Sequence, residues 1–316
     1  MDQDLSNYQY YLQEECGRAQ KTVAAYLGDL QRFRNFLDER DRDGGLRWEE
    51  VGADDIRAWF TSLDAPSTSY LRRMRSSVMM FYDYLIHVKK VMSNNPAKEI
   101  ASRKKIFRHP QALTVSESGR LIKAAFEHSS VRNRTRNWAA IAFLLHTGLR
   151  VSEFCAMRKQ DVRNKDGLPH SVRVIGKGNK ERRVVLSGQS QQALYQWLQK
   201  RKDVVARLSP ERVSDDYVWL TTSGRHAGHV WHQESVRRMV VKMGKLAGLS
   251  KHVHPHLLRH TFATEAVRAG AKLHALSEAL GHSSIATTGI YLHADEAELE
   301  AVAAILPEMV NLSDVT

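Results

Sequence analysis

At 316 residues, with 42% hydrophobic and 26% charged residues, the chain has the size and composition of a folded protein with two domains. It lacks the run of about 18 apolar residues that a transmembrane helix needs, and its two cysteines are too few for a disulfide framework. A net charge of +12 and a pI of about 9.7 favour a polyanionic partner. Residues 1–64 are net acidic, whereas residues 65–105 and 106–316 are net basic.

The first hundred residues are predicted to be helical. In residues 21–40, apolar side chains recur three and four residues apart, the spacing of one face of an amphipathic helix. Residues 52–63 predict a shorter helix with acidic side chains in its first turn. A third helix, about residues 68–90, combines an apolar stripe with three cations that are candidate DNA contacts: Arg72, Arg73 and Arg75.

Residues 102–113 are predicted to connect two domains, because they combine a basic run with a proline and show no sustained period. This places a helical domain at 1–101 and a second domain at 114–316. Lys104 and Lys105 in the connector are candidates for contacts to a phosphate backbone. An ordinary solvated connector is the alternative.

The second domain is predicted to be mostly helical with one β-hairpin. Two β-branched runs, 172–175 and 183–186, flank a turn rich in glycine and charge. The chain is therefore expected to be mainly α with a small β-sheet, an α+β fold.

Arg150 and Lys177 are candidate cations for an anionic substrate. Arg150 falls in the first turn of a predicted helix, where backbone N–H groups attract an anion. Glu153 lies three residues on and can hold the guanidinium. Lys177 lies between two glycines in the hairpin loop, beside Lys180 and Arg182, which are further candidate DNA contacts. A plain helix start and a flexible charged turn are the alternatives.

His256 and Arg259 follow Pro255, which suits the first turn of a helix. Being three residues apart, they share a face and can meet one phosphate. A rival zinc site would use the histidines at positions 252, 254, 256 and 260. No cysteine or carboxylate stands at the usual ligand spacing, so no metal is predicted.

Tyr291 is the candidate nucleophile. His282 follows Gly281, which is predicted to end a helix, and a serine after it can cap a short helix that carries Tyr291. A phenol, with a pKa of about 10, is a poor nucleophile without neighbouring cations and a base. Two guanidiniums, one ammonium and two imidazoles precede Tyr291, which suits attack on a phosphodiester.

The segments TGLRVSE, GKGNKER, HLLRHTFAT and LGHSSIATTGIY resemble the tyrosine recombinases, or phage integrase family. The likeness is weak over 1–105 and strong over about 110–293, and it points to Xer-like two-domain members. It implies a helical, SAM-like core-binding domain and a mixed α/β catalytic domain that form a clamp on DNA. It also implies that Arg150 and Arg259 clamp the scissile phosphate, with Lys177 as general acid for the leaving 5′-hydroxyl.

The resemblance further implies that His256 assists proton transfer from the nucleophile, that His282 hydrogen-bonds the phosphate, and that Tyr291 forms a 3′-phosphotyrosyl intermediate. Neither a metal ion nor ATP nor another cofactor is implied. Gly289 departs from the family, where a side chain is more common. Glycine in a helix costs about 1 kcal/mol relative to alanine, so the Tyr291 helix is expected to be loosely held. Sequence drift is the alternative.

The implied assembly is a homotetramer on a double-stranded recombination site, acting through a Holliday junction. Residues 297–316 carry an apolar stripe and are predicted to dock on a neighbouring protomer; packing on their own domain is the alternative. A partner recombinase or an accessory protein is a further candidate, and no membrane is involved. The expected location is the prokaryotic cytoplasm, associated with the nucleoid.

Two other functions remain open. A type IB topoisomerase-like enzyme would share the chemistry without synapsis, and a non-catalytic DNA-binding protein would keep only the fold. Within the recombinases, the role is either dimer resolution or integration and excision of a mobile element. Arg237 joins the arginines of the first domain as a candidate that contacts either bases or phosphates.

Overall fold

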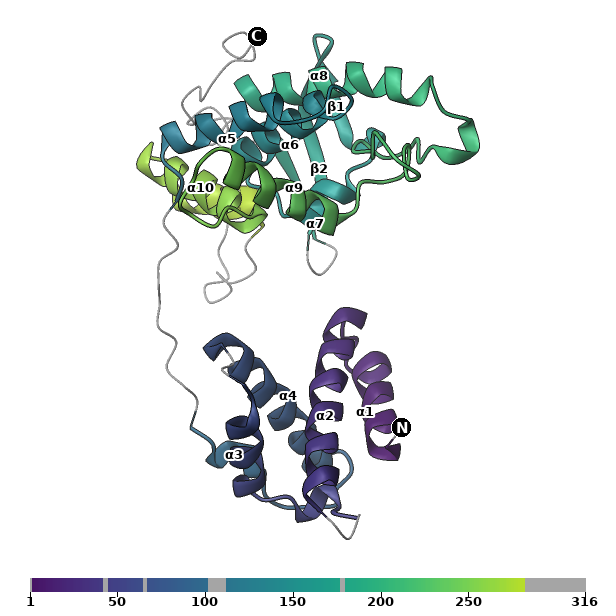
Figure 1. Cartoon of the computed structure of the whole chain (residues 1–316), viewed down its shortest axis with the longest axis vertical. Coiled ribbons are helices and arrows are strands. Elements are labelled where there is room, and N and C mark those ends of the chain that lie inside the picture. Colours follow the sequence, from purple (N-terminus) through teal and green to yellow (C-terminus); the bar gives the residue numbers. More distant parts are fainter. Residues whose placement is uncertain (1, 42–44, 65–66, 102–111, 177–179, 282–316) are drawn as a thin grey trace. The chain divides into compact units, whose positions relative to one another are not determined.

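The computed structural model describes residues 2–41, 45–64, 67–101, 112–176 and 180–281. The chain divides into two compact units, Met1–Arg108 and His109–Thr316, and each is described by itself (Figure 1). The division falls within the predicted connector, most of which lies outside the described residues. Among the described helices, none is long and apolar enough to cross a membrane.

The N-terminal unit is built from helices and tight turns, as the periodicity predicted. Helix α4 was expected to reach Lys90 but ends at His87, because Lys90 adopts a left-handed φ of 57°. The elements are α1 (Gln3–Tyr10), a π-helical turn (Tyr11–Glu15), α2 (Gln20–Arg40), a 3₁₀ turn (Trp48–Glu50), α3 (Ala53–Ser62), α4 (Thr68–His87) and a 3₁₀ turn (Pro96–Glu99).

Aromatic rings form the centre of this unit. The ring of Phe81 meets Trp48 edge-on at a centroid distance of 4.8 Å, and Phe33 stacks on Trp59 at 4.6 Å. All four side chains are buried. Such pairs add to the free energy that their buried area contributes, which explains how a unit of this size holds its helices together.

A buried carboxylate, Asp29, connects α2 to α4. It accepts hydrogen bonds from Ser77 Oγ at 2.8 Å and from Arg32 Nη1 at 3.2 Å, and it forms an ion pair with Arg73. Asp29 is fully buried, while both arginines stay partly exposed. A buried carboxylate needs partners, and Asp29 finds two of them on α4.

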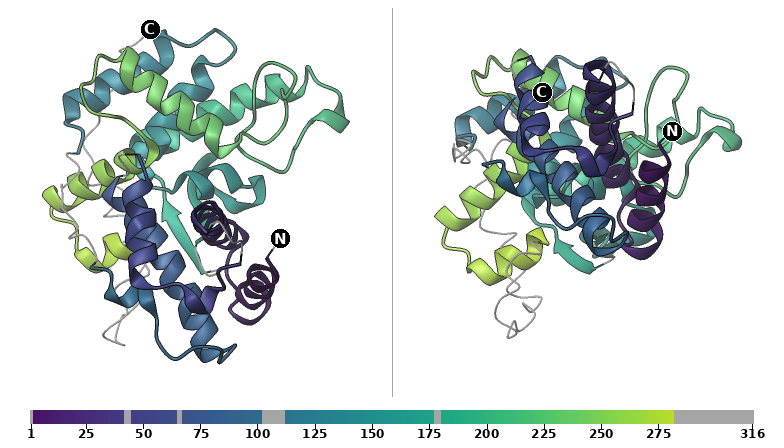
Figure 2. Two further views of the ribbon diagram at one scale, coloured as in Figure 1. Left: turned by 60° about the horizontal axis from the view of Figure 1, so that its bottom comes forward. Right: turned by 90° about the horizontal axis from the view of Figure 1, so that it is seen from below.

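The C-terminal unit is mainly helical with one three-stranded antiparallel sheet, in the order β1-β2-β3. Two further views show the helices around the short strands (Figure 2). The elements are α5 (Val115–Glu127), α6 (Arg134–Thr147), α7 (Val151–Ala156), a 3₁₀ turn (Lys159–Asp161), β1 (Val162–Lys165), β2 (Leu168–Ile175), β3 (Glu181–Val185), α8 (Gly188–Val205), a 3₁₀ turn (Pro210–Arg212), α9 (Gln233–Leu246), α10 (Pro255–Arg268) and α11 (Leu273–Leu280).

The predicted hairpin is confirmed by the pairing of β2 with β3, in which Val174 lies opposite Arg182. Helix α6 is buried on all sides from Arg136 to Thr147, so it lies in the middle of the core. A helix surrounded in this way has no polar face and therefore no amphipathic period.

The turn from α6 to α7 positions the candidate site. Gly148 ends α6 with a left-handed φ of 60°. A Cβ atom at Gly148 would lie 2.5 Å from Phe262 Cδ1 and 2.8 Å from Leu280 Cδ2, so the turn packs closely against α10 and α11. Only glycine meets both requirements, positive φ and close approach.

Candidate active site

Arg150 is the N-cap residue of α7, one position before the predicted first turn. Its backbone N–H donates to Glu153 Oε2, and its Nη1 donates to Glu153 Oε1, both at 2.8 Å. One carboxylate therefore caps the helix and holds the guanidinium at the same time. Such double use of a side chain leaves Arg150 little rotamer freedom.

Arg259 lies on α10, whose first residue is Pro255. Its guanidinium is buried and donates from Nη1 to the carbonyl of Gly148 at 2.8 Å and from Nη2 to the carbonyl of Leu280 at 2.6 Å. Burial, followed by the charge of Arg150, lowers the pKa of Arg259 to about 10. The guanidinium thus remains charged at neutral pH.

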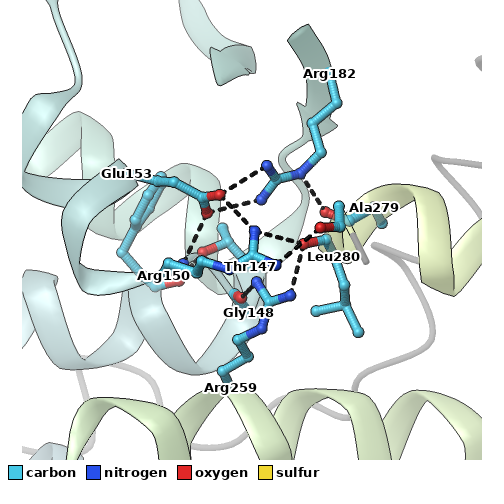
Figure 3. A network of polar contacts seen from close by, with 10 residues as sticks. Thr147, Gly148, Arg150, Glu153, Arg182, Arg259, Ala279 and Leu280 are labelled. Atoms are coloured by element: carbon cyan, nitrogen blue, oxygen red, sulfur yellow. Dashed lines mark hydrogen bonds and ion pairs between the residues drawn. The ribbon is translucent and has the colours of Figure 1, made fainter. Parts of the chain in front are cut away.

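The C-terminal end of α11 lies against the arginines (Figure 3). The carbonyl of Leu280 accepts from Arg259 and also from Arg150 Nη1 at 3.4 Å. The carbonyl of Gly281 accepts from Arg150 Nη2 at 2.8 Å. The last carbonyls of a helix have no partner within the helix and carry partial negative charge, so guanidiniums stabilise them.

A third guanidinium, Arg182 on β3, completes this network. Its Nη1 and Nη2 donate to the two oxygens of Glu153 at 2.9 and 2.8 Å, and its Nε donates to the carbonyl of Ala279 at 2.8 Å. Its side chain is only 6% exposed. Arg182 was predicted as a candidate DNA contact, but its donors point to Glu153 and α11.

The sequence held one local signal for this role, since Arg182 lies two residues before the apolar Val184 in the predicted hairpin. Glu181 and Arg183 are exposed, whereas the side chain of Arg182 is buried and lies on the face of β3 that carries Val184. Side chains two apart on a strand share a face. The charges of the hairpin were predicted as one group, and the inward direction of Arg182 was not predicted.

The network has a surplus of positive charge. Burial acts to raise the pKa of Glu153, but the hydrogen bonds and charge of Arg182, and then those of Arg150, outweigh it and lower that pKa. Glu153 is therefore ionised at neutral pH. The network holds three guanidiniums, those of Arg150, Arg182 and Arg259, and one carboxylate, which leaves a surplus of positive charge suited to an anion.

His256, the second residue of α10, is exposed. Its ring lies 6.4 Å from that of His254, which lies 5.6 Å from that of His252. His254 caps α10 through Nδ1, which accepts from the backbone N–H of Leu257 at 3.2 Å. Within the described ranges, no three histidine, cysteine or acidic side chains come together as metal ligands would.

Several predicted residues lie outside the described residues. They are Lys177, His282, Tyr291, Gly289, Lys104, Lys105 and the tail 297–316. The neighbour of Lys177 is described, however: a Cβ atom at Gly176 would lie 3.5 Å from Arg182 Nη1 and 3.8 Å from Glu153 Oε1. The base of the loop therefore lies beside the network.

The remaining cationic candidates differ in their partners. Arg73 pairs with the buried Asp29, and Arg75 Nε donates to the carbonyl of Ile100 at 2.8 Å. Arg237 on α9 lies 3.4 Å from Glu234 at the surface. Arg72 is half-buried and Lys180 is exposed.

Comparison with known proteins gives consistent similarities. Residues 111–298 match the model described as phage integrase family, and residues 5–89 match the phage integrase N-terminal SAM-like domain. The chain is 32% identical to a tyrosine recombinase XerC of Herpetosiphon aurantiacus over 100% of this chain and 99% of that protein. It is 32% identical to a tyrosine recombinase XerD of Chlorobaculum tepidum, over 94% of each.

Two solved structures share the fold at low identity. One is the XerH site-specific recombinase bound to a palindromic difH substrate in a post-cleavage complex, with a TM-score of 0.66 at 23% identity, covering 90% of this chain and 79% of that one. The other is a lambda integrase tetramer bound to a Holliday junction, with a TM-score of 0.68 at 19% identity, covering 90% of this chain and 78% of that one.

Proposed function

The chain belongs to the phage integrase family and is a tyrosine-type site-specific recombinase, and from this premise we propose how its residues cut and rejoin DNA. Arg150 and Arg259 bind the scissile phosphate, and the phenol of Tyr291 attacks its phosphorus. The bond between phosphorus and the 5′-oxygen breaks as the bond to Tyr291 forms. A 5′-hydroxyl later reverses the step, so the bond energy is conserved without a nucleotide cofactor.

The convergence of Arg150 and Arg259 on one oxygen carries this proposal. Both guanidiniums donate to the Leu280 carbonyl, so they face the same point. A guanidinium has five N–H donors, and the hydrogen bonds of Arg150 and Arg259 within the protein leave donors on each for phosphate oxygens. Guanidiniums fixed before the reaction stabilise the charge on the nonbridging oxygens without reorganising.

Proton transfers follow from the roles that the family implies. His256, exposed on α10, accepts the phenolic proton. Lys177 protonates the leaving 5′-oxygen, and His282 donates a hydrogen bond to the phosphate. Lys177, His282 and Tyr291 are outside the described residues, so these roles rest on the sequence motifs.

We also propose that four copies assemble on two DNA sites and proceed through a Holliday junction. The support is family membership together with the net charge of +12. Docking of residues 297–316 on a neighbouring protomer remains a prediction about this assembly. The named relatives are bacterial proteins, which supports a cytoplasmic, nucleoid-associated location.

Covalent trapping tests the reaction. A duplex recovered from a random DNA pool by binding receives a nick just downstream of the cleavage position, so that the short fragment that carries the new 5′-hydroxyl diffuses away and the adduct persists. The wild type should form an adduct that migrates slowly in a denaturing gel, and Tyr291→Phe should form none while it still binds the duplex. An adduct in Tyr291→Phe, or none in the wild type, would refute the proposal.

Strand exchange between two such sites separates a recombinase from a type IB topoisomerase-like enzyme. Both form the adduct, but only the recombinase joins strands of two different duplexes. Relaxation of supercoiled DNA without any exchange would favour the topoisomerase.

A further inference from the structure

We propose that Arg182 is a positioning residue of the cleavage reaction: it compensates the charge of Glu153, so that this carboxylate orients Arg150 without cancelling the positive charge that Arg150 presents to the phosphate. The inference rests on the proposed function and names a further residue that the reaction needs.

The two carboxylate oxygens of Glu153 accept four hydrogen bonds. Oε1 accepts from Arg150 Nη1 and Arg182 Nη1, and Oε2 accepts from the Arg150 backbone and Arg182 Nη2, all between 2.8 and 2.9 Å. An ionised carboxylate has about four lone-pair sites, so all of them are used. Each arginine holds both oxygens, which leaves the carboxylate one orientation.

The charge balance around Glu153 explains why the site needs Arg182 in addition to Arg150. Glu153 is 4% exposed, so water screens its charge poorly. If only Arg150 were paired with it, the pair would carry no net charge, and of the two arginines that bind the phosphate only Arg259 would still contribute a net positive charge. With Arg182 present, the group of Arg150, Glu153 and Arg182 keeps a positive charge.

Arg182 also lies close to the two segments that directly precede Lys177 and His282 in the chain. Its Nε holds the carbonyl of Ala279 near the end of α11, and His282 follows one residue after Gly281. On the other side, Gly176 directly precedes Lys177 and lies beside Arg182 Nη1. One guanidinium thus contacts both Glu153 and α11 and lies beside the residue that precedes Lys177.

The side-chain exposure of 6% speaks against a direct contact between Arg182 and a DNA phosphate. Its guanidinium bonds already use Nε, Nη1 and Nη2 on acceptors within the protein. A role through Glu153 and Arg150 therefore fits its surroundings better than DNA binding. This role predicts that loss of Arg182 slows the chemical step of cleavage and changes the affinity for DNA little.

A double-mutant cycle of Arg182→Met and Glu153→Gln tests the inference, with the single-turnover rate of adduct formation and the affinity for the duplex as readouts. Arg182→Met should slow adduct formation about 100-fold, as removal of one electrostatic group commonly does, while affinity changes little. In the Glu153→Gln background, loss of Arg182 should cost only a few-fold, because no carboxylate charge remains to be compensated.

A substrate with a neutral methylphosphonate at the cleavage position gives a second readout. Less negative charge then develops on the nonbridging atoms, so the penalty of Arg182→Met should shrink on this substrate. A purely structural role would slow both substrates equally. Arg173→Met is the matched control, since Arg173 is an exposed, ion-paired arginine on the neighbouring strand.

The outcomes separate the two proposals. If the wild type forms no adduct, the proposed function fails. If the wild type is active and Arg182→Met matches it, or if Arg182→Met costs the same in both backgrounds, the inference about Arg182 fails. Should Arg182→Met alone fold poorly, the comparison of Glu153→Gln with the double variant decides: a 100-fold loss there refutes charge compensation.

Discussion

Arg150 and Arg259 donate hydrogen bonds to one shared acceptor, the backbone carbonyl of Leu280 at the end of α11. The two guanidiniums come from different helices and like charges repel, so a negative group between them is stabilising. In the described structure the partial charge of a helix C-terminus fills this role. The predicted nucleophile Tyr291 follows α11 in the chain. Arg150 and Arg259 therefore contact the helix that precedes the nucleophile.

Replacing Arg259 should impair chemistry far more than DNA binding. Arg259→Met is expected to slow adduct formation about 100- to 1000-fold, because a fixed cation is lost where charge develops. Affinity for the duplex should change only a few-fold, since many phosphate contacts share it. Single-turnover trapping and a binding titration measure the two effects.

The matched control lies on the same helix. Arg268, near the end of α10, has a side chain that is 64% exposed and pairs with Glu265. Arg268→Met should leave the adduct rate within about twofold, because an exposed ion pair contributes little. Equal effects of the two variants would argue against a special role of Arg259.

Gly281→Ala should destabilise the chain more than its backbone angle alone explains. Gly281 has a φ of +64°, and a Cβ atom there would lie 2.9 Å from Arg182 Nη1. Gly248 has almost the same φ, +65°, but its Cβ atom would meet no atom within 4 Å. A left-handed residue with a side chain costs about 1–2 kcal/mol. Gly248→Ala therefore measures the cost of the backbone angle without a clash.

The difference between the two glycine variants isolates the contact with Arg182. Thermal unfolding should show a lower midpoint for Gly281→Ala than for Gly248→Ala, and adduct formation should be slower only in Gly281→Ala. Identical midpoints and rates would mean that Arg182 moves aside without cost.

Glu153 should contribute stability that depends on pH. Its pKa in the folded chain is lower than the ordinary value of 4.5, because the hydrogen bonds from Arg182 and Arg150 outweigh the effect of burial. A lowered carboxyl pKa contributes stability that is fully present above the unfolded pKa and is lost as pH falls through the folded value. The advantage of the wild type over Glu153→Gln should thus be constant near neutral pH and shrink below about pH 4.5.

Denaturant titrations of both proteins from neutral to acidic pH measure this difference. A gap in the free energy of unfolding that stays constant down to the lowest pH would contradict the assignment of an ionised, arginine-held carboxylate.

In the N-terminal unit, Asp29→Asn should cost about 1.5–3 kcal/mol of unfolding free energy, the range for hydrogen bonds to charged groups. Asp29 is buried and holds Arg73 and Ser77 of α4. Asp38→Asn on the same helix is the control, because Asp38 is 53% exposed and forms a surface ion pair with Arg34. Urea denaturation should give a lower midpoint for Asp29→Asn than for Asp38→Asn. Equal midpoints would mean that the contacts of Asp29 with α4 do not stabilise the unit.

Periodicity within short segments predicted much of the fold. Helix α2 spans Gln20–Arg40 where 21–40 was expected, and the hairpin of β2 and β3 lies where two β-branched runs flank a glycine-rich turn. These elements have one buried and one exposed face, so their sequences carry the period. Helix α6, buried on all sides, carries none, and its place in the core was not predicted.

The chemical groups of the candidate site could be predicted from the sequence, because each predicted residue lies in a local motif that needs no more than its neighbours. How these groups meet depends on tertiary packing: Arg182 turns inward to Glu153, and the carbonyl of Leu280 lies between Arg150 and Arg259. These interacting residues are far apart in the chain. One of the acceptors is a backbone carbonyl, a group that every residue has, so the sequence does not mark it. Such a contact depends on the packing of α7, α10, α11 and β3 against one another, which no local pattern encodes.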